Sequence, residues 1–138
     1  MFNLKKINEN PYLSGGHMKL KECYDLLGAD YNGVLNRLMR ETSISKFLIM
    51  MLKDTQWAEF HDSISKNDYE TAFRNVHTLK GTSLNLGLTG LANVSSVLTE
   101  ALRGGAPTCD ISEMIKNLDA EYDKTMKMIK EYSENPEI

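Results

Sequence analysis

Three residues of the run VHTLKG, at positions 76–81, have the types and spacing that phosphoryl transfer needs: His77, Lys80 and Gly81. On an α-helix, residues three and four positions apart are surface neighbours, so Lys80 and Gly81 both lie beside the imidazole. Neutral imidazole is a nucleophile near neutral pH and needs no separate base when the phosphate arrives as an acyl phosphate. The ammonium can then pair with the transferred group. Glycine costs about 1 kcal/mol inside a helix, and here it suits the close approach of a partner surface.

No second catalytic group accompanies this imidazole. The sequence contains no Gly-rich nucleotide loop, no cluster of carboxylates that would hold Mg²⁺, and no serine or cysteine with an evident base. The chain therefore cannot make its own phosphate donor. We interpret it as a carrier rather than an enzyme, with no cofactor or metal of its own, whose chemistry is completed by a partner's active site.

Composition excludes several other classes of protein. With 138 residues, of which 41% are apolar, the chain can form one hydrophobic core but not two. A net charge of −3 lacks the positive field that nucleic acids require. The longest apolar stretch, residues 47–52, is about a third of a membrane span, so we expect no membrane partner. Cys23 and Cys109 form no CxxC pair, so we expect reduced thiols and a cytoplasmic protein.

The first 17 residues differ from the rest. They are rich in turn-forming residues, show no helical periodicity, and lead into a His-Met pair at positions 17–18, a pair that often marks a cloning junction. We predict that residues 1–17 are a vector-derived or disordered leader, in which His17 has no function. Residues 18–138 are predicted to form a single domain.

Apolar residues after position 43 recur at intervals of three and four, which predicts an all-α fold. Short capping helices are expected at residues 19–27 and 31–39. The longer helices are expected from Ser43 to Ile64, with an irregularity near Asp54 and Thr55, then over 68–86, from 90 to the breaker GGAP at 104–107, and over 110–132. Ser43, Asp68 and Asp110 are the predicted N-caps. Short connections between long helices predict an antiparallel up-down-up-down four-helix bundle.

The helix that contains the VHTLKG run has two adjacent rows of side chains. Residues 72, 76, 79, 83 and 86 form a core row, whereas Phe73, His77, Lys80 and Leu84 form a mixed row beside it. We interpret the mixed row as a docking ridge, with Gly81 on its outer side. The candidate partner-binding residues are Phe73, Arg74, Leu84 and Asn85; Phe73 and Leu84 are equally consistent with core positions, and Arg74 with a solvent role.

The stretch AFRNVHTLKG at 72–81, with the following SLNLG at 83–87, resembles the signature of histidine-containing phosphotransfer (HPt) domains. Similarity also extends to Leu98-Thr99-Glu100 and, loosely, over residues 18–132, including YDLLG at 24–28. The resemblance implies a helical bundle in which His77 is the phosphoacceptor, Lys80 stabilises the phosphate and Gly81 admits the partner.

The implied partners are the receiver domains of a hybrid histidine kinase and of a response regulator. Mg²⁺ would belong to the receiver's aspartate pocket, and the carrier itself would be a monomer. On this hypothesis the protein is a phosphorelay intermediate of two-component signalling, which takes phosphate from one receiver and passes it to another.

Two alternatives remain. A helical adaptor would bind a receiver-like partner without any chemistry. A histidine-kinase fragment is disfavoured, because His77 is not followed by the acidic residue and proline of a kinase dimerisation helix, and no nucleotide-binding segment is present. His61 stands among Phe60, Asp62 and Ser63 without an evident partner, so we assign it no role.

Overall fold

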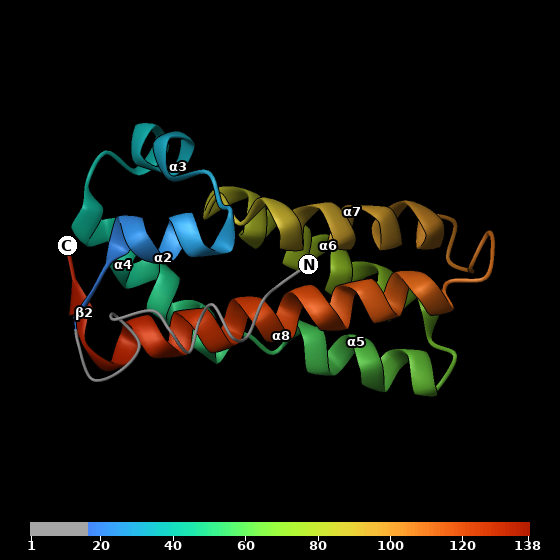
Figure 1. The fold of residues 1–138 in the computed structure, drawn as a ribbon. Helices are drawn as coiled ribbons and strands as arrows, with labels where there is room; N and C mark the ends of the chain where they lie inside the picture. The colour runs from blue at the N-terminus through green and yellow to red at the C-terminus, as the bar shows by residue number, and fades with distance from the viewer. Residues whose placement is uncertain (1–16) are drawn as a thin grey trace.

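The computed structural model describes residues 17–138 and shows an almost entirely helical chain (Figure 1). The all-α helical bundle predicted from the sequence is confirmed. The predicted leader lies outside the described residues, except for the exposed His17. In chain order the elements are β1 (Met18–Lys19), α2 (Leu20–Leu27), α3 (Tyr31–Leu38), α4 (Glu41–Met50), the 3₁₀ turn η1 (Met51–Lys53), α5 (Gln56–Ser65), α6 (Tyr69–Asn85), α7 (Thr89–Leu102), α8 (Ser112–Glu134) and β2 (Pro136–Glu137).

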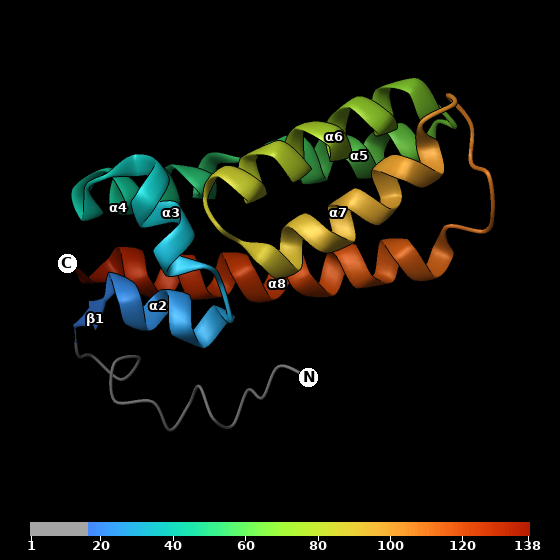
Figure 2. The same ribbon diagram turned by 90° about the horizontal axis from the view of Figure 1, so that it is seen from above.

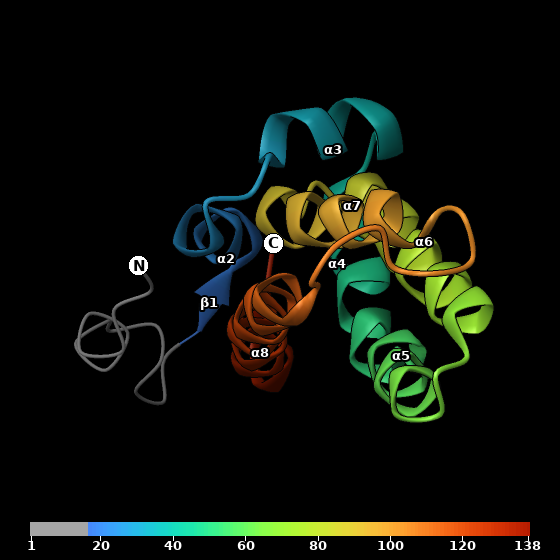
Figure 3. The same ribbon diagram turned by 90° about the vertical axis from the view of Figure 1, so that its right-hand side faces the viewer.

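The long helices α5, α6, α7 and α8 surround one interior, as the view along the bundle shows (Figure 3). Helix α6 packs between α5 and α7, and α7 also packs on α8. Helix α2 lies along the C-terminal part of α8, while α3 and α4 cover the same end of the bundle (Figure 2). The turns between α5 and α6 and between α6 and α7 are short, as the predicted antiparallel order requires.

Every long helix contributes large apolar side chains to the core. Burying a side chain of this size contributes about 1.5–3 kcal/mol, so these contacts dominate the stability of the bundle. The two-residue strands β1 and β2 pair in parallel and bring the buried Met18 beside Pro136. Fully buried members include Leu48, Phe60, Val76, Leu79, Leu98, Leu118 and Ile129.

The first long helix is not continuous, and this corrects the helix predicted from Ser43 to Ile64. Helix α4 begins at Glu41, so Ser43 lies inside its first turn instead of capping it. The chain leaves helical geometry at Asp54, near the predicted irregularity. Its carboxylate accepts hydrogen bonds from the backbone N–H of Trp57 at 3.3 Å and from the Tyr122 hydroxyl at 3.0 Å. Asp54 thus both supports the restart of the helix as α5 and ties it to α8.

The predicted N-caps have different outcomes. Asp68 caps α6, since its carboxylate accepts the N–H of Thr71 at 3.2 Å. The N-cap of α8 is Ile111 rather than Asp110. Asp110 still accepts the N–H of Ser112 at 2.9 Å, because its side chain reaches past the cap residue to a first-turn amide that the helix leaves unpaired.

The turn between α6 and α7 is anchored to the N-terminal helices. The Tyr24 hydroxyl donates to the carbonyl of Leu86 at 2.7 Å, and the N–H of Asp30 donates to the carbonyl of Gly87 at 2.8 Å. Gly87 has a φ of +68°, and a Cβ at this position would lie 2.6 Å from the backbone oxygen of Asp30. Only glycine fits both the left-handed conformation and the close backbone contact.

We expect Gly87→Ala to lower the free energy of unfolding by about 1–3 kcal/mol, because the methyl group adds a backbone clash to an unfavourable φ. The measurement is urea denaturation followed by far-UV circular dichroism. Gly104→Ala is the matched control, since a Cβ there meets nothing within 4 Å. Equal stability of Gly87→Ala and the wild type would contradict the role assigned to this turn.

Candidate functional site

The face of α6 that leaves the core carries the predicted site. Ala72, Val76 and Leu79 are buried, and this register turns His77 and Gly81 to the surface. Lys80 lies one turn after His77 and is half-buried. The imidazole is therefore open to an approaching group on a rigid helix.

The rotation of α6 is also fixed from its other side. Asn75 is buried, and its side-chain N–H groups donate to Gln56 at 3.0 Å and to Glu59 at 3.3 Å, both on α5. The Ser63 hydroxyl donates to the Asn75 carbonyl oxygen at 3.3 Å. Because a buried amide must keep its partners, these bonds prevent α6 from rotating and moving the imidazole.

Phe73 contacts His77 directly. The two rings are stacked, with centroids 5.7 Å apart and planes 8° from parallel. Phe73 is half-buried and also packs against the core, as one of the two alternatives left open by the sequence predicts; its partner-binding role stays a prediction. A ring held by the core on one side and stacked on the imidazole limits the orientations of that imidazole.

Two charged residues, Glu100 in the last turn of α7 and Arg103 directly after this helix, complete the surroundings of the imidazole. The Arg103 guanidinium lies over the ring of Phe73, 5.5 Å from its centroid. It also donates to the Glu100 carboxylate, from Nη2 at 2.7 Å and from Nε at 3.2 Å. The pKa of Glu100 is lowered, first by this hydrogen bond and then by electrostatic interaction with Arg103, Lys80 and His77. Glu100 therefore lies within electrostatic reach of both site residues of α6.

Glu100 and Arg103 were not among the residues predicted for the site. Glu100 belongs to the tripeptide Leu98-Thr99-Glu100 that resembles the HPt signature, whereas no pattern in the sequence singled out Arg103. Their spacing of three on a helix was a usable signal, since oppositely charged residues at this spacing pair on a helix surface. What the sequence lacks is the packing of α7 on α6, which places the pair beside Phe73.

Lys80 forms no direct ion pair with another residue in the part of the chain that the structure describes. Its charge acts on Glu100 at longer range. The ammonium is thus available to an incoming anion on the same side of the helix as the imidazole.

The remaining candidates lie around this pair along α6. A Cβ at Gly81 would meet nothing within 4 Å, so nothing inside the described protein demands glycine there. Leu84 is 53% exposed and Asn85 is exposed, which places both on the surface. Arg74 is exposed and donates to the Thr71 hydroxyl at 3.0 Å.

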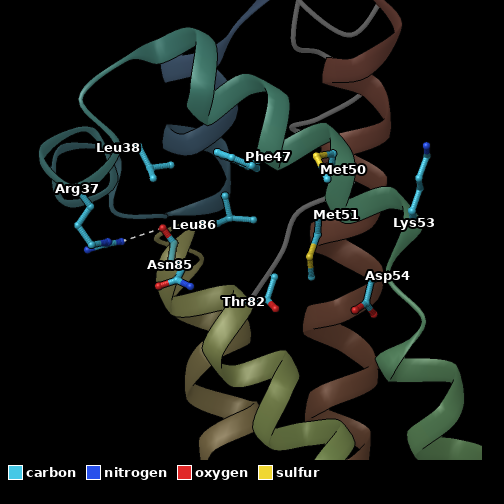
Figure 4. Close-up of a pocket in the computed structure, with 10 residues that line it drawn as sticks. All are labelled: Arg37, Leu38, Phe47, Met50, Met51, Lys53, Asp54, Thr82, Asn85 and Leu86. Atoms are coloured by element: carbon cyan, nitrogen blue, oxygen red, sulfur yellow. Dashed lines mark hydrogen bonds between the residues drawn. The ribbon is translucent and has the colours of Figure 1, made fainter.

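A pocket of about 600 Å³ borders the C-terminal part of α6, between this helix and α3, α4 and η1 (Figure 4). Its walls include Leu86, Met51 and the partly exposed Phe47 and Met50. Arg37 of α3 donates to the carbonyl oxygens of Leu84 and Asn85 at 2.7 and 3.2 Å, which holds α3 against the end of α6. Of the candidate partner-binding residues, Asn85 is the one that lines this pocket.

His61 has partners, contrary to the sequence-based interpretation. Its Nε2 lies 2.6 Å from Oδ1 of Asp119, which also accepts the indole N–H of Trp57 at 2.8 Å. The Trp57 ring stacks on Tyr122 with centroids 5.1 Å apart. These residues join α5 to α8, so His61 has a structural role that long-range packing alone creates.

Three further findings concern the described residues only. No group of three or more His, Cys, Asp or Glu side chains among them could hold a metal ion. No helix within residues 17–138 has the length and apolar character that crossing a membrane requires. Both cysteines are free thiols, and burial raises the pKa of Cys23 to about 12.

The fold and the site together define an all-α bundle that presents an open imidazole, with a cation one turn away, on the face of one helix. The family model of the Hpt domain matches residues 47–125, which is more than half of the chain and contains His77, Lys80 and Gly81. The chain belongs to the Hpt domain family. Neither the curated proteins nor the solved structures gave a match.

Membership of this family sets the general role. Hpt domains are phosphotransfer carriers rather than conventional enzymes, and they take part in two-component phosphorelays. They do so by interacting with receiver domains. The protein is therefore a component of such signalling, with a receiver domain as the kind of partner.

We expect Gly81→Ala to raise the free energy of unfolding by about 0.5–1 kcal/mol, because alanine is the better helix former and the added methyl group meets empty space. Thermal unfolding followed by circular dichroism measures this. A loss of stability would show that Gly81 is needed for folding, and would remove the argument that it serves a partner.

Proposed function

We propose that this protein accepts a phosphoryl group on His77 from the aspartyl phosphate of one receiver domain and passes it to the aspartate of another. The observation that carries the proposal is the exposed imidazole inside the segment matched by the Hpt family, with the ammonium of Lys80 on the same side. The donor would belong to a hybrid histidine kinase and the acceptor to a response regulator.

The transfer step needs few groups from this chain. The unprotonated ring nitrogen of His77 attacks the phosphorus, the bond from phosphorus to the aspartyl oxygen breaks, and the carboxylate leaves with the electron pair. The other ring nitrogen keeps its proton, so no base is required. Lys80 pairs with the transferred oxygens. Mg²⁺ is assigned to the receiver's pocket, and the second transfer is the reverse of the first.

The receiver is proposed to cover the surface from His77 to the pocket at the end of α6. Seven residues, about 10 Å of helix, separate His77 from Leu84, and a receiver domain spans that length easily. Phe47 and Met50, which line the pocket, are 42% and 52% exposed, and Leu84 on α6 is 53% exposed. Exposed apolar side chains of this size suit contact with a protein partner. Gly81 lies between the two ends and lets the receiver approach the backbone.

The proposal also covers the oligomeric state and the cellular location of the protein. We propose a monomeric carrier that acts in the cytoplasm, and gel filtration with light scattering tests the first point. The competing adaptor hypothesis predicts receiver binding without transfer. It differs from the relay in a single observable, the presence of phosphate on the histidine.

We expect His77→Gln to abolish labelling by a phosphorylated receiver, because the variant lacks the nucleophilic ring nitrogen that the transfer step requires. The experiment screens the receiver domains of the source organism, phosphorylated with acetyl phosphate, and scores acid-labile label on the carrier. His61→Gln is the matched control and should keep the label, since His61 pairs with Asp119 away from α6. Equal labelling of the wild type and His77→Gln would refute the assignment, and binding without label in any combination would favour the adaptor.

We expect Leu84→Asp to weaken receiver binding about tenfold, equivalent to about 1.4 kcal/mol, because it places a charge at an apolar contact. Binding is measured by isothermal titration calorimetry with the receiver that labels the wild type fastest. Ala120→Asp, at an exposed position of α8, is the control and should bind normally. Unchanged affinity of Leu84→Asp would place the docking surface elsewhere.

A further inference from the structure

The carboxylate of Glu100 is an internal anion beside the site. It receives two hydrogen bonds from Arg103, the shorter of them 2.7 Å, and it lies within electrostatic reach of Lys80 and His77. Both members of the ion pair are more than half exposed, so the pair can open without unfolding the helix. A phosphoryl group arriving at His77 would therefore find Arg103 already paired with Glu100.

Arg103 and the imidazole both contact the ring of Phe73. Its guanidinium lies 5.5 Å from the centroid of Phe73, and the His77 ring lies 5.7 Å from the same centroid. Arginine presents a planar fork of N–H donors that matches a phosphoryl group as well as it matches a carboxylate. The same side chain could therefore pair with either anion.

We propose that Glu100 competes with the phosphoryl group on His77 for the positive charges of Arg103 and Lys80, and so destabilises the phosphorylated carrier relative to the receiver's aspartyl phosphate. The inference rests on the proposed function, because it assumes that His77 carries phosphate. Charged side chains at the C-terminal end of α7 would then help to set the equilibrium between the phosphorylated carrier and the phosphorylated receiver.

The charges around the imidazole give the reason. Two cations, Arg103 and Lys80, face one carboxylate before transfer, and the phosphoryl group then adds a charge of about −2. Glu100 adds a further negative charge beside the phosphoryl oxygens, and both anions draw on the same two cations, Arg103 and Lys80. A carrier that held phosphate too firmly would not pass it on, so an anion that weakens the product keeps transfer reversible.

The test compares transfer equilibria. Wild type, Glu100→Gln, Arg103→Gln and the control Glu131→Gln are each incubated with the receiver that labels the wild type fastest, phosphorylated with acetyl phosphate and then freed of this donor. The fraction of label on His77 at equilibrium is measured by phosphate-affinity gel electrophoresis. Glu131 is an exposed residue near the C-terminal end of α8, and its substitution by glutamine removes the same charge away from the site.

We expect Glu100→Gln to shift the equilibrium toward phosphorylated His77 by about two- to fivefold, the range for exposed ion pairs. Arg103→Gln should shift it toward the receiver, and Glu131→Gln should leave it unchanged. The shift in Glu100→Gln should shrink as NaCl rises from about 0.05 to 0.5 M, because salt screens charges at this distance. A purely structural role of Glu100 would not produce this salt dependence.

The possible outcomes distinguish a failure of this inference from a failure of the proposed function. A labelled wild type with an unchanged or receiver-shifted equilibrium in Glu100→Gln would overturn the competition and leave the relay intact. An unlabelled wild type would overturn both. Circular dichroism confirms that each variant is folded, and folding is expected because all the substituted side chains are exposed.

Discussion

The register of α6 in the core is the constraint on which the site depends. Val76 and Leu79 are fully buried on either side of His77 in sequence, and Asn75 is fixed to α5 by hydrogen bonds. Rotating the helix to bury the imidazole would expose these apolar groups and leave a buried amide unpaired, which costs several kcal/mol. The imidazole therefore stays at the surface because its neighbours cannot leave the interior.

The turn after α6 decides what surrounds that imidazole. Gly87 allows a sharp change of direction, and hydrogen bonds from Tyr24 and Asp30 fix the turn to the N-terminal helices. Helix α7 consequently packs on α6 and brings Glu100 and Arg103 beside Phe73. The site thus draws on two parts of the fold, α6 supplying the imidazole and the C-terminal end of α7 supplying charged side chains near it.

The two ends of the exposed α6 surface differ in character. Around His77 the groups are charged or aromatic, whereas the far end opens into a hollow lined by Phe47, Met50 and Leu86 (Figure 4). The break of the first long helix at Asp54 creates this hollow in part, because η1 turns its residues toward the end of α6.

The sequence by itself determined the helical class, the extent of most helices, the cap at Asp68 and the face of α6 that carries His77, because these follow from local periodicity and side-chain hydrogen bonding. It located the irregularity near Asp54 but not the break, since the hydrogen bond from Tyr122 comes from 68 residues away. Only the tertiary structure decided the partner of His61, the place of Phe73 and the pairing of Glu100 with Arg103 beside the imidazole. Contacts between helices depend on how whole surfaces pack, and no local pattern records which side chains will meet.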